Sequence, residues 1–260
     1  MPAVHASSST DAPLAGAGVL ITRPARQAGG LAEKIAVLGG RPVIFPAIVI
    51  EPPVDGSALR RAHDALERYD YAVFVSANAV EFGAPDPRRW PAKLVAFAPG
   101  QGTAEALLAV GIANVRTPTT TQDSAGLLAL PEFTDVSGRR VLIFRGDGGR
   151  EELGDALRAR GATIDYVACY RRAKPVGAQG LQDAFAQGRI DAVTITSSEG
   201  LDNLWSLLDA STRARWSRLP TFVPHERIAQ HARTLGLDVV LTGPGDAGLI
   251  AALLEWATPR

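Results

Sequence analysis

The chain has 260 residues, 27 basic and 27 acidic side chains, no formal net charge at pH 7 and a hydrophobic fraction of 46%. This length allows one large domain or two small ones. No basic face is implied, so nucleic acid is not an expected partner. No apolar run approaches the roughly 20 residues of a membrane span, so we expect no membrane association.

The single cysteine, Cys169, excludes an intramolecular disulfide and is typical of a reducing compartment, which predicts a cytoplasmic protein. Residues 1–16 are rich in Ala, Ser and Pro and lack the charged and apolar regions of a signal peptide, so we expect a disordered tail. The four histidines make no metal-ligand spacing with Cys169, and no nucleotide-binding or GxSxG motif occurs. We therefore expect no metal and no cofactor.

Short apolar runs that are mostly β-branched or aromatic predict buried parallel strands. In chain order these runs are VLI (19–21), VIF (43–45), AVFV (72–75), LVAF (94–97), VLIF (141–144), AVTI (192–195), TFV (221–223) and VVL (239–241). Helical patterns lie between them, as at Leu31, Ile35 and Leu38. Four helices are expected to end on glycines that adopt the left-handed conformation, namely Gly39, Gly111, Gly161 and Gly236.

The chain resembles itself at a repeat of about 120 residues, the usual size of a small domain. VLITRP (19–24) matches VLIFRG (141–146), and DYAVFVSANAV (70–80) matches DAVTITSSEGL (191–201). FAPGQGTAEALLAVG (97–111) matches FVPHERIAQHARTLG (222–236), and SAGLLAL (124–130) matches DAGLIAA (246–252). Chance similarity is the alternative, but the order and the spacing agree. The alternation of strands and helices predicts an α/β fold of two similar doubly wound parallel-sheet domains.

Polar residues follow several of the predicted strands, at the edge where such sheets bind ligands. Ser76 and Ser197 occupy matching positions in the two repeats. Helix N-termini with short hydroxyl donors suit carboxylates or phosphates, which favours an anion site. Simple capping of the helices by these residues is the alternative reading.

Tyr170 stands in the stretch VACYRR (167–172), where we expect a strand to end. The tyrosine either fills a seam between the domains, as half-buried tyrosines do, or donates a proton as a phenol beside arginines. The residues alone leave both readings open.

The motifs VLITRP, FVSANAV, GQGTA, VLIFRGDGGREEL and TITSSEGL occur in the order that resembles the uroporphyrinogen-III synthase family, over residues 19–254. The resemblance implies two α/β lobes joined by a two-strand linker, with the active cleft between them. One lobe would hold residues 1–47 and 174–260 and the other residues 48–173. The linkers would lie near residues 47–53 and 169–175, where Pro52, Pro53 and Pro175 fit extended connectors.

The resemblance also implies an activity, the closure of hydroxymethylbilane to uroporphyrinogen III with loss of water and inversion of the last pyrrole ring, without a cofactor. Tyr170 would be the acid. The substrate-binding motifs fall on Thr22, Arg23, Ser76, Asn78, Gly100, Thr103, Gly146, Arg150 and Ser197. A monomer is expected, and a transient contact with the preceding pathway enzyme is left open.

The sequence departs from the family pattern at residues 225–229, which read HERIA where many members repeat GxxTA. Ile228 takes the hydroxyl position, so His225 or Arg227 would replace that contact by charge, or the segment is an ordinary helix start. Arg23 either contacts substrate or braces its own loop. A two-lobed protein that only binds an anionic small molecule is the main functional alternative, and a duplicated regulatory domain is a weaker one.

Overall fold

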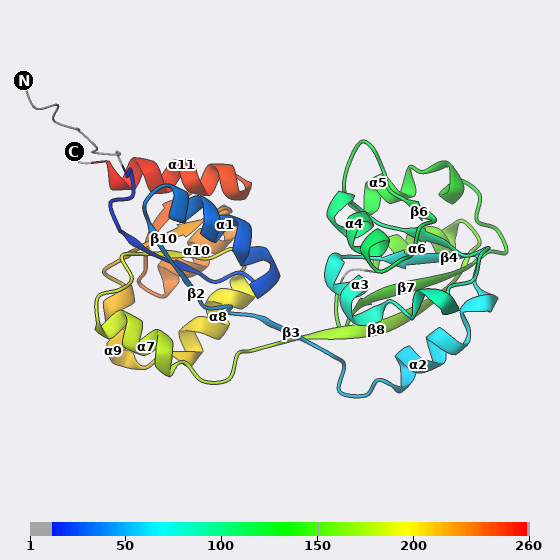
Figure 1. The fold of residues 1–260 in the computed structure, drawn as a ribbon, viewed down its shortest axis with the longest axis horizontal. Helices are drawn as coiled ribbons and strands as arrows, with labels where there is room; N and C mark the ends of the chain where they lie inside the picture. The colour runs from blue at the N-terminus through cyan, green and yellow to red at the C-terminus, as the bar shows by residue number, and fades with distance from the viewer. Residues whose placement is uncertain (1–11, 150, 259–260) are drawn as a thin grey trace, which may run out of the picture. The chain divides into compact units, whose positions relative to one another are not determined.

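A computed structural model of the chain describes residues 12–149 and 151–258. It divides into two compact units. Unit 1 combines the chain up to Val49 with the chain from Ala173 onward, and unit 2 is the intervening segment Ile50–Arg172. Figure 1 traces the chain through unit 1, into unit 2 and back.

The sheet of unit 1 joins strands from both ends of the chain. Its strands are β1 (Gly18–Ile21), β2 (Arg41–Ile44), β9 (Ala192–Thr194), β10 (Pro220–Val223) and β11 (Asp238–Leu241). They lie in the order β11-β10-β9-β1-β2, and every neighbouring pair is parallel. From β1 the chain leads to β2 on one side of the sheet, and from β9 it leads through β10 to β11 on the other side. The strand order therefore reverses between β1 and β9.

Helices cover both faces of this sheet because alternate strand residues point to opposite faces. Val19 and Ile21 pack in one cluster with Leu31, Leu249 and other residues of two helices, α1 (Ala25–Val37) and α11 (Gly245–Ala257). Leu20 and Val193 belong to the cluster on the other face. That face is covered by α7 (Gln179–Ala186), α8 (Ser198–Leu207), α9 (Ala210–Trp216) and α10 (Glu226–Thr234).

Unit 2 repeats the same topology. Its sheet contains β3 (Val49–Glu51), β4 (Tyr71–Phe74), β5 (Val95–Phe97), β6 (Val115–Arg116), β7 (Arg140–Gly146) and β8 (Thr163–Ala173). The order is β3-β8-β7-β4-β5-β6. With β3 set aside, β7 takes the place of β1, β8 that of β2, and β4, β5 and β6 those of β9, β10 and β11. Each sheet is thus completed by strands from both repeats.

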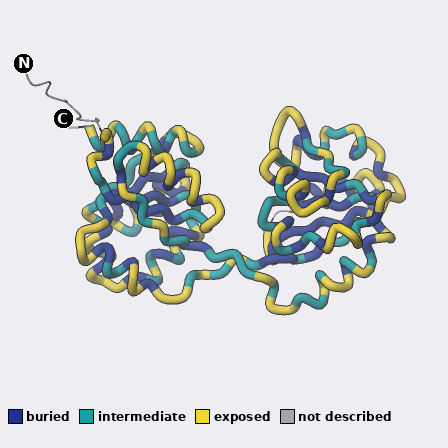
Figure 2. Tube along the Cα trace, viewed as in Figure 1, coloured by how far each residue is buried: buried dark blue, intermediate teal, exposed yellow. Residues whose placement is uncertain are grey.

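The core of unit 2 also has two faces. Phe74 and Phe144 stack at 4.3 Å between ring centroids on the face covered by α2 (Ser57–Asp64), α3 (Ala77–Gly83) and α4 (Gln101–Ala109). Val73 and Ile143 face α5 (Ser124–Leu128) and α6 (Glu152–Ala159). Short 3-10 helices span Leu66–Arg68, Pro87–Arg89 and Pro131–Phe133. Figure 2 shows the buried segments concentrated along the strands of each unit.

The two doubly wound domains and all eight predicted strands are confirmed. The four predicted helix-ending glycines have positive φ angles of 81°, 87°, 88° and 78°, in chain order. β3 lies within the linker strand that the family resemblance implied near residues 47–53, whereas the short strand β6 was not predicted. No helix in the described part of the chain combines the length and apolar character needed to cross a membrane.

Two sequence expectations are corrected. β8 does not end at Tyr170 but continues to Ala173, because it gains a pairing partner in β3. The expected disordered tail is wrong for residues 12–16. These residues form turns in which Leu14 is 1% exposed and its N–H donates to the Leu38 carbonyl. Residues 1–11, the rest of that expected tail, lie outside the described residues.

Cys169 is fully buried on β8, and burial raises the pKa of its thiol to about 12. Its Sγ lies 3.2 Å from the Arg145 carbonyl oxygen. Because the thiolate is the reactive species, we expect no reaction of Cys169 with a thiol-specific disulfide reagent at pH 8 in the native protein, and complete reaction in denaturant. Absorbance of the released thiol measures this. Rapid native labelling would contradict the burial.

Candidate functional site

Two threonines form hydrogen bonds between β1 and β9, the strands at which the strand order of unit 1 reverses. Thr22, directly after β1, donates its hydroxyl proton to the Thr194 carbonyl oxygen at 2.6 Å, and Thr194 donates its own to the Leu20 carbonyl oxygen at 2.9 Å. Thr22 is 5% exposed. Because a hydroxyl has one proton, the Thr22 hydroxyl cannot donate to a ligand while this bond exists.

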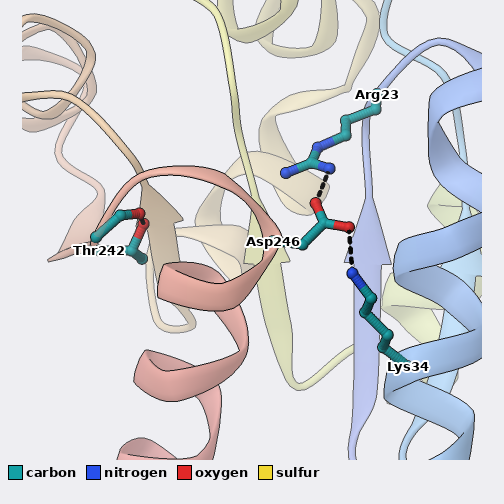
Figure 3. Close-up of polar contacts among 5 residues, drawn as sticks. Arg23, Lys34, Thr242 and Asp246 are labelled. Carbon is teal, nitrogen blue, oxygen red and sulfur yellow. Dashed lines mark hydrogen bonds and ion pairs between the residues drawn. The ribbon is translucent and has the colours of Figure 1, made fainter. Parts of the chain in front are cut away.

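Arg23 follows Thr22 and extends to the start of α11, where it forms an ion pair with Asp246 (Figure 3). This contact fits the reading in which Arg23 braces its surroundings, although the partner comes from α11 and not from its own loop. The bond uses Nη1 alone. The side chain keeps 16% of its surface exposed.

Ser76 and Ser197 take the same structural role in the two units. Each is an N-cap, with Ser76 Oγ accepting from the Ala79 N–H at 3.2 Å and Ser197 Oγ accepting from the Gly200 N–H at 3.0 Å. Capping therefore accounts for one lone pair of each hydroxyl. The hydroxyl proton of Ser197 has no acceptor among the described residues, which leaves a donor at the start of α8.

Tyr170 lies inside unit 2, against the loops that follow β4 and β7. Its hydroxyl is 3.4 Å from Ser76 Oγ, and the residue is 6% exposed. Gly146 faces the phenol ring so closely that a Cβ there would lie 2.9 Å from it. Asn78 is half-buried, and its amide has no hydrogen-bond partner within residues 12–149 and 151–258. Tyr170, Ser76 and Gly146 thus form one cluster at the carboxyl edge.

The remaining candidates in unit 2 border the same edge. Gly100 is the N-cap of α4, and a Cβ there would lie 2.7 Å from Oε1 of Gln122, so the position requires glycine unless that side chain moves. Thr103 is 8% exposed in the first turn of α4. Arg150 lies outside the described residues.

His225 and Arg227 open α10 in unit 1 and are both exposed. Neither side chain bonds to any residue that the structure describes. Ile228 is 2% exposed and belongs to the core of unit 1. The exposed side chains of His225 and Arg227 lie at this strand end on either side of Glu226, which forms an ion pair with Arg233.

The carboxyl edge of unit 1 therefore brings together Thr22, Arg23, Ser197, His225 and Arg227 after β1, β9 and β10. That of unit 2 brings together Ser76, Asn78, Gly100, Thr103, Gly146 and Tyr170 after or near β4, β5 and β7. Sequence reasoning missed Asp246. The repeated motif DAGLIAA begins at Asp246, but the repeat did not predict that this residue pairs with Arg23. Within the described residues, no cluster of side chains is suited to hold a metal ion.

Each unit is a doubly wound domain whose sheet combines strands from both repeats. Both units present hydroxyls and backbone amides at the carboxyl edge, and unit 1 also presents Arg23 and Arg227 there. These features define a class of duplicated two-unit α/β proteins with strand-end loops suited to anions. The family model for uroporphyrinogen-III synthase HemD matches residues 30–251. The chain belongs to this family.

Relatives from enteric bacteria cover most of the chain. The uroporphyrinogen-III synthases of Salmonella typhimurium and Escherichia coli are each 36% identical to it over 225 residues, which is 84% of this chain and 91% of the relative. A crystal structure of a mutant uroporphyrinogen III synthase from the extremely thermophilic bacterium Thermus thermophilus aligns with a TM-score of 0.52 and 19% identity. The alignment covers 92% of this chain and 99% of that chain. This structural likeness supports the fold.

Proposed function

We propose that the chain closes hydroxymethylbilane to uroporphyrinogen III, releasing water and inverting the last pyrrole ring. Membership of the uroporphyrinogen-III synthase family carries the proposal. The substrate is a linear tetrapyrrole with eight acetate and propionate groups. Donors at the carboxyl edges of both units suit such a polyanion, because helix N-termini and short hydroxyls bind carboxylates.

The proposed reaction depends mainly on how the protein positions the two ends of the bilane. Loss of the hydroxymethyl oxygen as water leaves an azafulvene-like cation, and a substituted carbon of the last ring attacks it to give a spiro intermediate. The spiro centre fragments and recloses through the other carbon, and a proton is lost to restore the aromatic pyrrole. Because the bilane also closes unaided without inversion, the protein must hold its ends in the geometry that favours the spiro route.

In this proposal Tyr170 donates the proton that lets hydroxide leave as water, and the same phenol oxygen accepts the proton lost at the end. Ser76 supports the phenol hydroxyl through the contact at 3.4 Å. The binding contacts come from Ser76, Asn78, Gly100, Thr103, Gly146 and Arg150 of unit 2 and from Thr22, Arg23, Ser197, His225 and Arg227 of unit 1. At Thr22 we assign the backbone, since its hydroxyl is engaged.

Product analysis tests the activity. Purified chain supplied with hydroxymethylbilane is expected to yield mainly the inverted isomer, separated from the spontaneous product by chromatography after oxidation. Formation of the spontaneous product alone, at the rate seen without protein, would contradict the proposed activity. The protein would then only bind the bilane or have another role.

Replacing Ser197 by aspartate separates its two roles. Aspartate caps helices as well as serine does, so we expect the free energy of unfolding to change by less than about 0.5 kcal/mol. The new negative charge repels a substrate carboxylate, so KM should rise about tenfold. Steady-state kinetics and denaturant unfolding measure the two effects.

Asp209 supplies the matched control, because it caps α9 by accepting from the Thr212 N–H at 2.7 Å. The reverse change Asp209→Ser should leave both KM and stability nearly unchanged. An unaltered KM in a folded Ser197→Asp variant would limit Ser197 to capping.

We also infer a cytoplasmic, monomeric enzyme. The single cysteine is a free buried thiol, in keeping with a reducing compartment. Size-exclusion chromatography with light scattering tests the monomer.

A further inference from the structure

Asp246 connects three segments at the carboxyl edge of unit 1. It lies in the first turn of α11 and accepts hydrogen bonds from Arg23, which follows β1, and from Lys34 in the last turn of α1. The Lys34 bond is 3.1 Å long. Figure 3 shows the two cations approaching the carboxylate from different elements.

This cluster has an excess of positive charge, since two cations share one carboxylate. Although partial burial by itself would raise the pKa of Asp246, the hydrogen bonds from Arg23 and Lys34 outweigh it and hold that pKa below its usual value. Asp246 is therefore charged near neutral pH and can hold a cation firmly.

Arg23 retains binding capacity after pairing with Asp246. A guanidinium carries five N–H donors, and the bond to Asp246 uses Nη1. The other nitrogens of Arg23 reach no acceptor among the described residues. A planar guanidinium fixed at one corner can bind a second carboxylate bidentately, with less entropy lost than by a mobile side chain.

The matching arginine of the repeat, Arg145, is held differently. Its Nη2 donates to the Gly149 carbonyl oxygen at 2.6 Å, and its guanidinium lies 4.9 Å from the centre of the Tyr166 ring. Its Nη1 lies 3.6 Å from Oε1 of the exposed Glu151. Ser124 stands where the repeat would place an equivalent of Asp246. Both arginines therefore have an acidic neighbour, but the partner of Arg23 comes from α11, whereas Glu151 follows the same strand as Arg145.

We propose that Asp246 is a positioning residue, which holds Arg23 so that the remaining guanidinium N–H groups bind one carboxylate of the tetrapyrrole substrate. This inference rests on the proposed function. It predicts that Asp246 affects substrate binding through Arg23 and not through the chemical step.

A double-mutant cycle tests the coupling. Asp246→Asn should raise KM about tenfold, the usual effect of a charge-assisted hydrogen bond, and change kcat by less than about twofold. In an Arg23→Gln background the same change should have no further effect on KM. Equal increases in both backgrounds, or an unchanged KM in the single variant, would overturn the proposal.

Two further variants serve as a replacement for Asp246→Asn and as a control. If Asp246→Asn folds poorly, Asp246→Ser replaces it, because serine is the residue found at the matching position of unit 2. Asp191→Asn is the control, since Asp191 accepts from the Gly18 N–H at 2.7 Å and lies 3.8 Å from Arg41 at the opposite edge of the same sheet. It should leave KM unchanged. A wild-type chain without cyclisation activity would refute the proposed function instead.

Discussion

Tyr170→Phe is expected to lower kcat for bilane cyclisation about 100-fold, the lower range for loss of a general acid. The substitution removes the phenol oxygen, which lies 3.4 Å from Ser76 Oγ, and keeps the ring that packs beside Phe82 and Gly146. The single-turnover rate and the proportion of inverted isomer are the quantities to measure.

The same variant should remain folded. The contact at 3.4 Å is long for a hydrogen bond between hydroxyls, so its loss should cost no more than about 1 kcal/mol. Ser76→Ala provides the comparison, because it removes the contact and the cap but keeps the phenol. An unchanged kcat in Tyr170→Phe would remove Tyr170 from the acid role and leave it as a core residue of unit 2.

Gly126→Ala and Gly248→Ala should each destabilise one unit by about 3 kcal/mol, at the upper end for overpacking. A Cβ at Gly126 would lie 1.8 Å from the Thr121 carbonyl oxygen, and a Cβ at Gly248 would lie 2.2 Å from the Gly243 carbonyl carbon. In both cases the obstacle is backbone, so a whole loop must move away from the start of a helix.

Each unit carries its own reporter of unfolding. Exposure of Cys169 reports on unit 2, and fluorescence reports mainly on unit 1, which contains Trp205, Trp216 and Trp256. Gly102→Ala and Gly180→Ala are the helical controls, because a Cβ at either position meets nothing within 4 Å. Both controls should be neutral or stabilising. Equal stability of Gly126→Ala and wild type would contradict the close approach.

The sequence contained enough to predict the fold because its signals are local. Apolar runs locate the strands. Gly39, Gly111, Gly161 and Gly236 mark helix ends, because each adopts a positive φ angle there. The alternation of strands and helices predicted the doubly wound fold, and the repeat of about 120 residues predicted two such domains. β6 escaped detection because it is two residues long and depends on a neighbouring strand for pairing.

The candidate site was less predictable because its contacts join distant residues. The internal repeat already identified Ser76 and Ser197, whose caps use N–H groups three residues away. The sequence motifs could not show that the Thr22 hydroxyl donates to the Thr194 carbonyl oxygen, 172 positions away in the chain. Nor could they pair Arg23 with Asp246, since that contact exists only after β1 and α11 enter one unit.

The proposal that the strand-end loops of each unit bind carboxylates of the tetrapyrrole is the central claim, and amide hydrogen exchange tests it most directly. With saturating uroporphyrin III, the oxidised product, we expect slower exchange in residues 76–80 and 98–103 of unit 2 and also in residues 22–26 and 196–201 of unit 1. Slowing confined to one unit, or absent from both, would contradict the account.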